Sequence, residues 1–149
     1  MLTAYTRLQK ILEQTPARLQ AFTEAGATEK PAANKWSKKE ILGHLIDSAS
    51  NNHQRFVRMQ IDLAITLPKY QQDEWVEIQQ WQQREWKDII ELWKIFNQHI
   101  LHIFGCIDER KLWNTITLGS ATYTLQFIVD DYVDHMLHHL QQIFKEENT

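Results

Sequence analysis

The sequence predicts an all-α protein, a four-helix bundle built as one domain over residues 1–149. Three observations lead to this fold. The chain has only 4 Gly and 3 Pro, it is rich in the helix formers Leu, Gln, Glu and Lys, and four long segments place apolar residues at helical spacing. With 43% hydrophobic and 23% charged residues, a chain of this length can bury a core of its own. We therefore expect four helices around one apolar core.

The first two helices are predicted from their apolar spacing and their end signals. The first covers about residues 2–22, and Pro16 marks a position where it could break or kink. A loop over residues 26–35 follows. Ser37 and Glu40 have the spacing of a capping box, in which each side chain bonds a backbone N–H of the other residue. The second helix is therefore predicted from Lys38 to about residue 64.

The third and fourth helices are predicted over about residues 83–104 and 123–145, and Gly105 is expected to end the third. The connection before residue 83 is long and rich in aromatic residues, so it should pack over one end of the bundle. The inward stripe of the third helix is Trp86, Ile89, Ile90, Trp93, Phe96, Ile100 and Phe104, and that of the fourth is Leu125, Ile128, Tyr132, Met136, Leu140 and Ile143.

Two of the seven histidines, His135 and His139, are four residues apart and therefore share a helix face. They continue the inward stripe of the fourth helix, where an imidazole without a partner would be costly to bury. This spacing allows both rings to bind one metal ion. His138 lies on the opposite, solvated face.

His44 follows the capping box by one turn and could supply a third ligand from the second helix. Asp47, Asn51 and Arg55 share its helix face, together with Ser48. This polar line has two readings: it borders a pocket, or it is an amphipathic margin from which Arg55 reaches solvent. The three remaining histidines, His53, His99 and His102, lie off these stripes, and the three-residue spacing of His99 and His102 indicates surface positions.

Several classes of protein are excluded by composition. The net charge of −3 and the scattered basic residues are untypical of a protein that binds nucleic acid. No apolar stretch approaches the roughly 18 to 20 residues needed to span a membrane. The lone Cys106 cannot form an internal disulfide, and the first residues lack the apolar core of a signal peptide. We expect a cytoplasmic protein.

Three segments resemble the DinB-like, or YfiT-like, superfamily of metal-dependent enzymes. The first contains KWS at residues 35–37 and GHLIDS at residues 43–48 and continues to Asn51 and Arg55. The second contains DDYVDH at residues 130–135 and HHL at residues 138–140, and residues 70–75 resemble the family's middle loop. The resemblance implies an up-down-down-up bundle and one divalent metal ion. Its ligands would be His44, His135 and His139.

A site of three imidazoles would leave coordination positions open for water or substrate, as in catalytic metal sites. Imidazole ligation suits zinc and nickel, with iron and copper as alternatives. The resemblance implies a hydrolase or a transferase of a low-molecular-weight thiol, acting on a small molecule. Asp47 would be a general base or would orient His44, and Asn51 and Arg55 would contact the substrate.

Two other interpretations stay open from the sequence. The protein could be a non-catalytic metal-binding or stress-associated protein, or its three histidines could be satisfied core residues. A homodimer is expected because such bundles often pair through helix faces. The segment after His135 lacks the Glu of a zinc-protease helix, which disfavours a protease mechanism.

Overall fold

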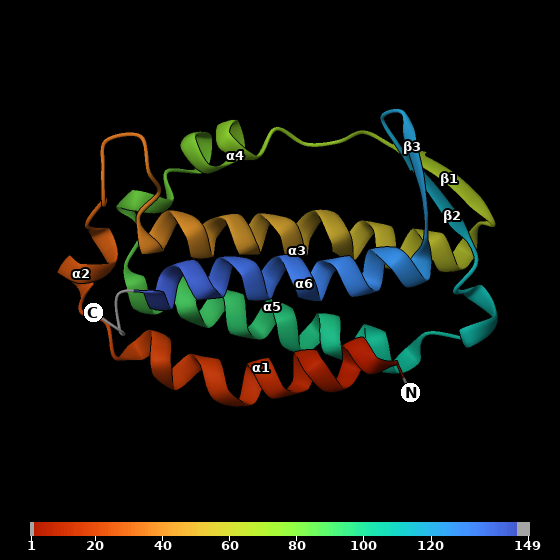
Figure 1. The fold of residues 1–149 in the computed structure, drawn as a ribbon, viewed down its shortest axis with the longest axis horizontal. Coiled ribbons are helices and arrows are strands. Elements are labelled where there is room, and N and C mark those ends of the chain that lie inside the picture. Colours follow the sequence, from red (N-terminus) through yellow and green to blue (C-terminus); the bar gives the residue numbers. More distant parts are fainter. Residues whose placement is uncertain (1, 146–149) are drawn as a thin grey trace.

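The computed structural model describes residues 2–145 and contains four long helices that pack side by side (Figure 1). They are α1 (Thr3–Gln20), α3 (Lys38–Ile61), α5 (Trp86–Cys106) and α6 (Leu125–Phe144). Helices α1 and α6 run in one direction, and α3 and α5 run in the other. The predicted four-helix bundle with an up-down-down-up arrangement is therefore confirmed.

Because α3 and α5 are parallel, the chain between them must return along the whole length of the bundle (Figure 1). This connection contains strand β1 (Ala64–Leu67), helix α4 (Gln72–Gln79) and the 3-10 helix η1 (Trp81–Gln83). Val76 and Trp81 are buried where it packs on α3. Residues 41–49 of α3 are consequently buried on every face, including their polar members.

A small sheet at one end of the bundle was not predicted. Its order is β1, β2 (Thr115–Leu118) and β3 (Ala121–Thr124). β1 and β2 are parallel, with Ala64 opposite Thr115, and β2 and β3 are antiparallel, with Thr115 opposite Thr124. The turn between β2 and β3 uses Gly119 at φ +63°, a conformation that glycine adopts without strain. Four-residue strands are too short to give a clear alternating pattern.

The sheet changes two predicted helix boundaries. Helix α3 ends at Ile61 and not near residue 64, because Ala64 already belongs to β1. Helix α6 begins at Leu125 and not at residue 123, because Tyr123 lies in β3. Thr124 caps α6, since its hydroxyl oxygen accepts a hydrogen bond from the Phe127 amide at 3.2 Å.

Other boundaries differ for local reasons. Helix α5 begins at Trp86 because residues 81–83 form η1, and it ends at Cys106, so Gly105 lies inside the helix and does not stop it. Helix α1 runs through Pro16 without a break. The loops also contain the short α2 (Glu24–Thr28) and the 3-10 helix η2 (Glu109–Lys111).

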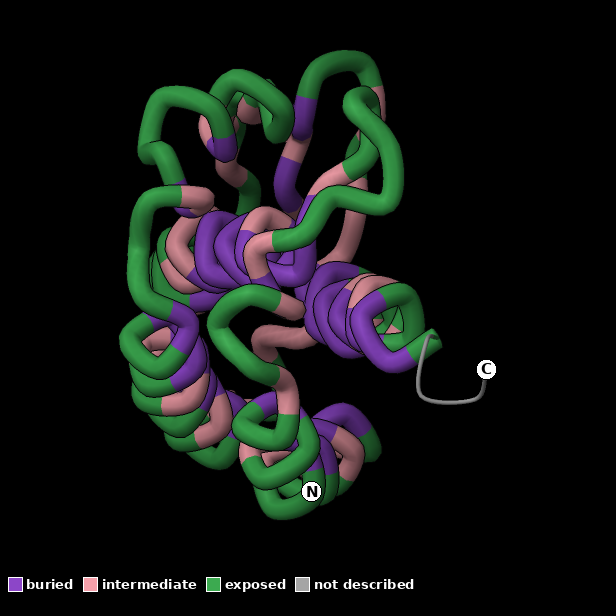
Figure 2. The backbone as a smooth tube through the Cα atoms, turned by 90° about the vertical axis from the view of Figure 1, so that its left-hand side faces the viewer, coloured by how far each residue is buried: buried purple, intermediate pink, exposed green. Residues whose placement is uncertain are grey.

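The core lies where the helices face one another. Figure 2 shows the buried stretches on the helices and mostly exposed connecting loops. The predicted inward stripes of α5 and α6 are buried, except that Phe96 is half-buried. Among residues 2–145, no helix combines the length and the apolar character that crossing a membrane requires.

Candidate metal centre

His44 is held near the start of α3 by the predicted capping box. The Ser37 hydroxyl accepts from the Glu40 amide at 3.1 Å, and the Glu40 carboxylate accepts from the Ser37 amide at 3.0 Å. These bonds satisfy two backbone donors that the first turn leaves free and fix where the helix begins. His44, one turn further on, is completely buried.

The antiparallel packing of α6 on α3 brings two more imidazoles to His44. His135 and His139 come from the second half of α6, which lies beside the first half of α3 (Figure 1). The ring centroids are 5.0 Å apart for His44 and His135, 4.7 Å for His44 and His139, and 4.5 Å for His135 and His139. One nitrogen from each ring lies within 4.8 Å of the others, so the three predicted residues converge.

The distances between the nitrogens suit a metal ion. The Nε2 atoms of His44 and His135 are 3.1 Å apart. Two imidazole nitrogens bound tetrahedrally at the usual 2.0–2.1 Å from zinc would be roughly 3.3 Å apart. His139 Nδ1 lies 2.9 Å from the Gln142 side-chain oxygen. If Nδ1 donates its hydrogen there, Nε2 of His139 carries the free lone pair that a metal requires.

The environment keeps these rings neutral. Burial, followed by the nearby His135 and His139, lowers the pKa of His44 to about 3. Burial and the neighbouring His139 and His138 lower the pKa of His135 to about 4. Burial also lowers the pKa of His139. Neutral imidazoles are the form that binds metal, so at neutral pH no proton has to be displaced.

Asp47 lies one turn after His44, and its partners come from the α3–α5 connection. Its carboxylate accepts from Gln79 Nε2 at 2.7 Å and from Trp81 Nε1 at 3.4 Å. Burial raises the Asp47 pKa to about 6, although both hydrogen bonds oppose this shift. Nδ1 of His44 has no hydrogen-bond partner in the described part of the chain. Asp47 therefore does not orient His44 through a hydrogen bond, and its role as a base stays a prediction.

Asn51 and Arg55 continue along α3 away from the histidines. The Asn51 side chain donates to the Asp47 carbonyl oxygen at 2.9 Å, so its amide is partly used within the helix. Arg55 is half-buried, and burial lowers its pKa while Tyr70 and Asp131 oppose that shift. The polar line is thus covered by the connection and is not a simple solvated margin. Contacts of Asn51 and Arg55 with a substrate stay predictions.

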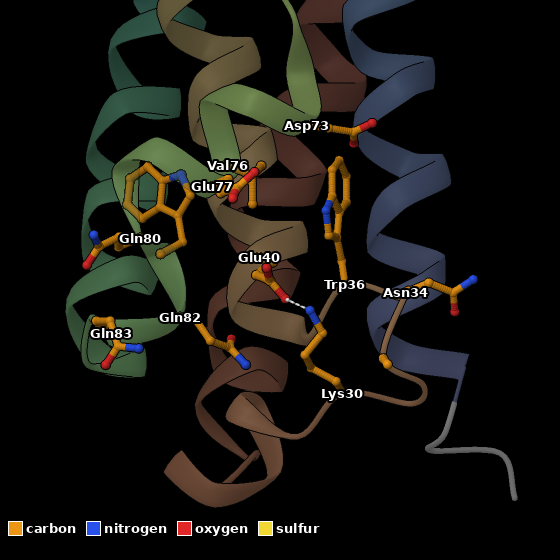
Figure 3. Close-up of a pocket in the computed structure, with 12 residues that line it drawn as sticks. Lys30, Asn34, Trp36, Glu40, Asp73, Val76, Glu77, Gln80, Gln82 and Gln83 are labelled. Carbon is orange, nitrogen blue, oxygen red and sulfur yellow. Dashed lines mark ion pairs between the residues drawn. The ribbon is translucent and has the colours of Figure 1, made fainter.

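Trp36 joins the histidines to a neighbouring cleft. Its ring lies 4.9 Å from that of His44 and 6.4 Å from that of His139. Trp36 lines a cleft of about 520 Å³, and Lys30 and Glu40 pair at 3.3 Å in the same cleft. Figure 3 shows Trp36 between the loop before α3 and helix α4, with the Lys30–Glu40 pair below it. The other lining residues are mostly polar: Ala33, Asn34, Asp73, Val76, Glu77, Gln80, Trp81, Gln82 and Gln83.

Sequence reasoning missed Gln79 and Trp81 as partners of Asp47. Nothing in their spacing points to α3, because they approach it from a long connection. The sequence contains one indication of this contact, the glycine at position 43 inside the predicted helix. In the structure, a Cβ added there would lie 2.3 Å from Trp81 Cγ. A glycine inside a helix often marks close approach of another group. His138 is exposed, in agreement with its predicted surface position.

Comparisons with known proteins identify the family and the fold. Residues 7–143 match the model of the DinB superfamily. The structure is similar to that of YfiT from Bacillus subtilis, described as a probable metal-dependent hydrolase with an unusual four-helix bundle topology. The TM-score is 0.82 at 18% sequence identity, over 95% of this chain and 84% of YfiT. None of the curated proteins matches this chain in sequence.

Proposed function

This chain belongs to the DinB superfamily, and from that premise we propose that it is a metal-dependent enzyme acting on a small molecule. One divalent metal ion, zinc or nickel, would be held by His44, His135 and His139. The observation that carries the proposal is the convergence of three neutral imidazole nitrogens within 4.8 Å on two antiparallel helices. YfiT, with the same fold, is described as a probable metal-dependent hydrolase.

Three protein ligands leave the remaining metal positions for water or substrate. A metal ion held there lowers the pKa of a bound water or thiol and so supplies a nucleophile at neutral pH. This chemistry supports two reactions, hydrolysis of a small molecule and transfer of a low-molecular-weight thiol. The polar cleft beside Trp36 is large enough for part of a small substrate.

Other residues of this chain would transfer the proton and bind the substrate. Asp47 carries a carboxyl group with a pKa of about 6, which makes it suitable to accept and return a proton near neutral pH. Gln79 and Trp81 hold this carboxyl in place. Arg55, half-buried and further along α3, could pair with an anionic group of the substrate, and Asn51 could bind it by a hydrogen bond.

The test is to measure metal in the purified protein, remove it with a chelator, and restore zinc or nickel separately. The wild type should bind one ion per chain at the three-histidine site, and His44→Ala should lose that ion. His138→Ala is the matched control, since His138 is an exposed neighbour on α6. Absence of metal uptake by the wild type would refute the proposal.

The reloaded protein should then be assayed for amide hydrolysis and for conjugation of a low-molecular-weight thiol. Activity that disappears with the metal and with His44→Ala supports an enzyme. Stoichiometric metal without turnover in either assay supports a non-catalytic metal-binding or stress-associated protein instead. A homodimer and a cytoplasmic location also stay proposals. Light scattering on the purified protein would test the dimer.

A further inference from the structure

Arg55 lies on the same face of α3 as His44. The two are eleven positions apart, so at about 100° per residue their side chains leave the helix within about 20° of each other. Nη1 of Arg55 lies 3.5 Å from the Asn52 side-chain oxygen, and the Asn52 amide donates to the Ser48 carbonyl oxygen at 2.9 Å. The Arg55 side chain therefore turns back toward His44. Asn52 and His44 are separated by roughly 12 Å along the helix, so the guanidinium lies within about that distance of the histidines.

The positive charge of Arg55 lacks a paired carboxylate. None of the ion pairs within residues 2–145 includes Arg55, although its side chain is half-buried. Asp131 of α6 is the carboxylate whose charge acts on Arg55, but Asp131 is exposed and makes no direct contact with it. A guanidinium presents five N–H donors, and a partly buried cation without a counter-charge is costly. This position therefore favours an anionic ligand.

Tyr70 of the α3–α5 connection supplies a second donor beside Arg55. Its side chain is half-buried, and its ring packs edge-on against Trp75 at 5.4 Å. Burial raises the pKa of Tyr70, whereas the nearby charge of Arg55 and a hydrogen bond with the Ser48 side chain oppose that rise. Ser48 lies between His44 and Arg55 on α3, so the phenol lies between the histidines and the guanidinium. The protonated phenol can donate a hydrogen bond there.

We propose that Arg55 and Tyr70 together bind the carboxylate of a small carboxylic acid whose reacting group lies at the metal centre. This inference rests on the proposed function, because the metal ion would fix the other end of the substrate. One carboxylate oxygen pair can accept from both the guanidinium and the phenol. A single negative charge is favoured over two, since Asp131 acts on Arg55 and Asp47 acts on Tyr70, and both would repel a dianion such as a phosphate ester. The substrate must be short enough to fit the spacing of roughly 12 Å.

Isothermal titration calorimetry of the zinc-loaded protein tests this site with the monohydroxamates of straight-chain dicarboxylic acids. The hydroxamate binds zinc and the free carboxylate extends toward Arg55, so affinity should pass through a maximum as the chain lengthens from succinate to suberate. At the best length the acid should bind about tenfold more tightly than its primary amide, and the matching phosphonate should bind more weakly than the acid.

The outcomes separate this inference from the proposed function. Equal affinity of acid and amide at every chain length would refute the carboxylate site, while zinc and hydroxamate binding would still support the metal centre. Tighter binding of the phosphonate would also overturn the assignment to a carboxylate. Failure of the protein to bind zinc would refute the proposed function and the inference that rests on it.

Four variants test the two donors. Arg55→Gln should bind the acid no more tightly than the amide, with unchanged zinc content, and Arg58→Gln is the matched control because Arg58 is exposed on α3 and bonds Gln54. Tyr70→Phe removes only the hydroxyl and should weaken the acid about fivefold while the amide is unaffected. Asp131→Asn should strengthen acid binding, since it removes a competing negative charge. Acid binding in Arg55→Gln and Tyr70→Phe equal to that of the wild type, or an equal loss of acid and amide binding, would overturn the inference.

Discussion

The replacement of Gly43 by alanine tests how closely the α3–α5 connection packs against α3 beside the metal centre. Gly43 directly precedes His44, and the added Cβ would lie 2.3 Å from Cγ and 2.5 Å from Cδ1 and Cδ2 of Trp81. Ordinary carbon contacts are about 3.5–4.0 Å, so the indole must move by more than 1 Å. Trp81 is buried and donates to Asp47, which leaves it little room to move.

The expected cost follows from three contributions. Forcing extra volume into a packed site costs about 1–3 kcal/mol, and loss of the hydrogen bond from Trp81 to Asp47 costs about 1 kcal/mol. Alanine is about 1 kcal/mol more favourable than glycine inside a helix, which offsets part of the loss. Gly43→Ala should therefore lower the free energy of unfolding by about 2 kcal/mol in urea denaturation.

A double-mutant cycle isolates the cause. In a Trp81→Ala background the indole that would clash with the added Cβ is absent, so Gly43→Ala should raise the free energy of unfolding by up to about 1 kcal/mol. The coupling energy would then be about 3 kcal/mol. Gly105→Ala is a matched control, because its Cβ would meet only Tyr5 at 3.3 Å, and it should change stability by less than about 1 kcal/mol. An equal cost of Gly43→Ala in both backgrounds would refute the reasoning.

Three further predictions follow from the site. In chelator-treated protein, His44 and His135 have pKa values of about 3 and about 4. As the pH falls below the ordinary histidine pKa of 6.5, these two histidines therefore take up protons in the unfolded chain before they do so in the folded one. Urea denaturation should show stability falling from pH 7 to pH 5 by about 2 kcal/mol for each of these two histidines, and the loss should be smaller in His135→Gln. Ser37→Ala should cost about 1–2 kcal/mol through the capping box, whereas Ser50→Ala should cost little; equal effects would contradict the capping role. If Asp47 is the base, turnover should rise with pH around 6, and Asp47→Asn should lose that inflection while keeping its metal content. An unchanged pH profile in Asp47→Asn would exclude Asp47 as the base.

The long helices could be predicted because their signals are local. The stripe from Trp86 to Phe104 repeats at helical spacing over several turns, and the capping box at Ser37 marks a helix start from four residues alone. The small sheet could not, because Ala64 pairs with Thr115 across 50 intervening residues. Such pairing depends on where the helix ends meet in space, which a local pattern does not contain.

The candidate site was predictable to the extent that helix faces determine it. Spacing placed His135 and His139 on one face, and the family resemblance joined His44 to them. The hydrogen bonds of Asp47 were not accessible in the same way, because Gln79 and Trp81 reach it from a connection whose path is set by tertiary packing.

The direction of the helices also limits how this protein can be re-engineered. Because α1 and α6 are parallel, the start of α1 at Thr3 and the end of α6 at Phe144 lie at opposite ends of the bundle (Figure 1). At 1.5 Å per residue these points are roughly 30 Å apart. A circular permutant would need a flexible Gly/Ser linker of roughly 30 residues to span this distance without strain. A head-to-tail fusion of two copies needs no such span, because the second bundle can be placed end to end with the first.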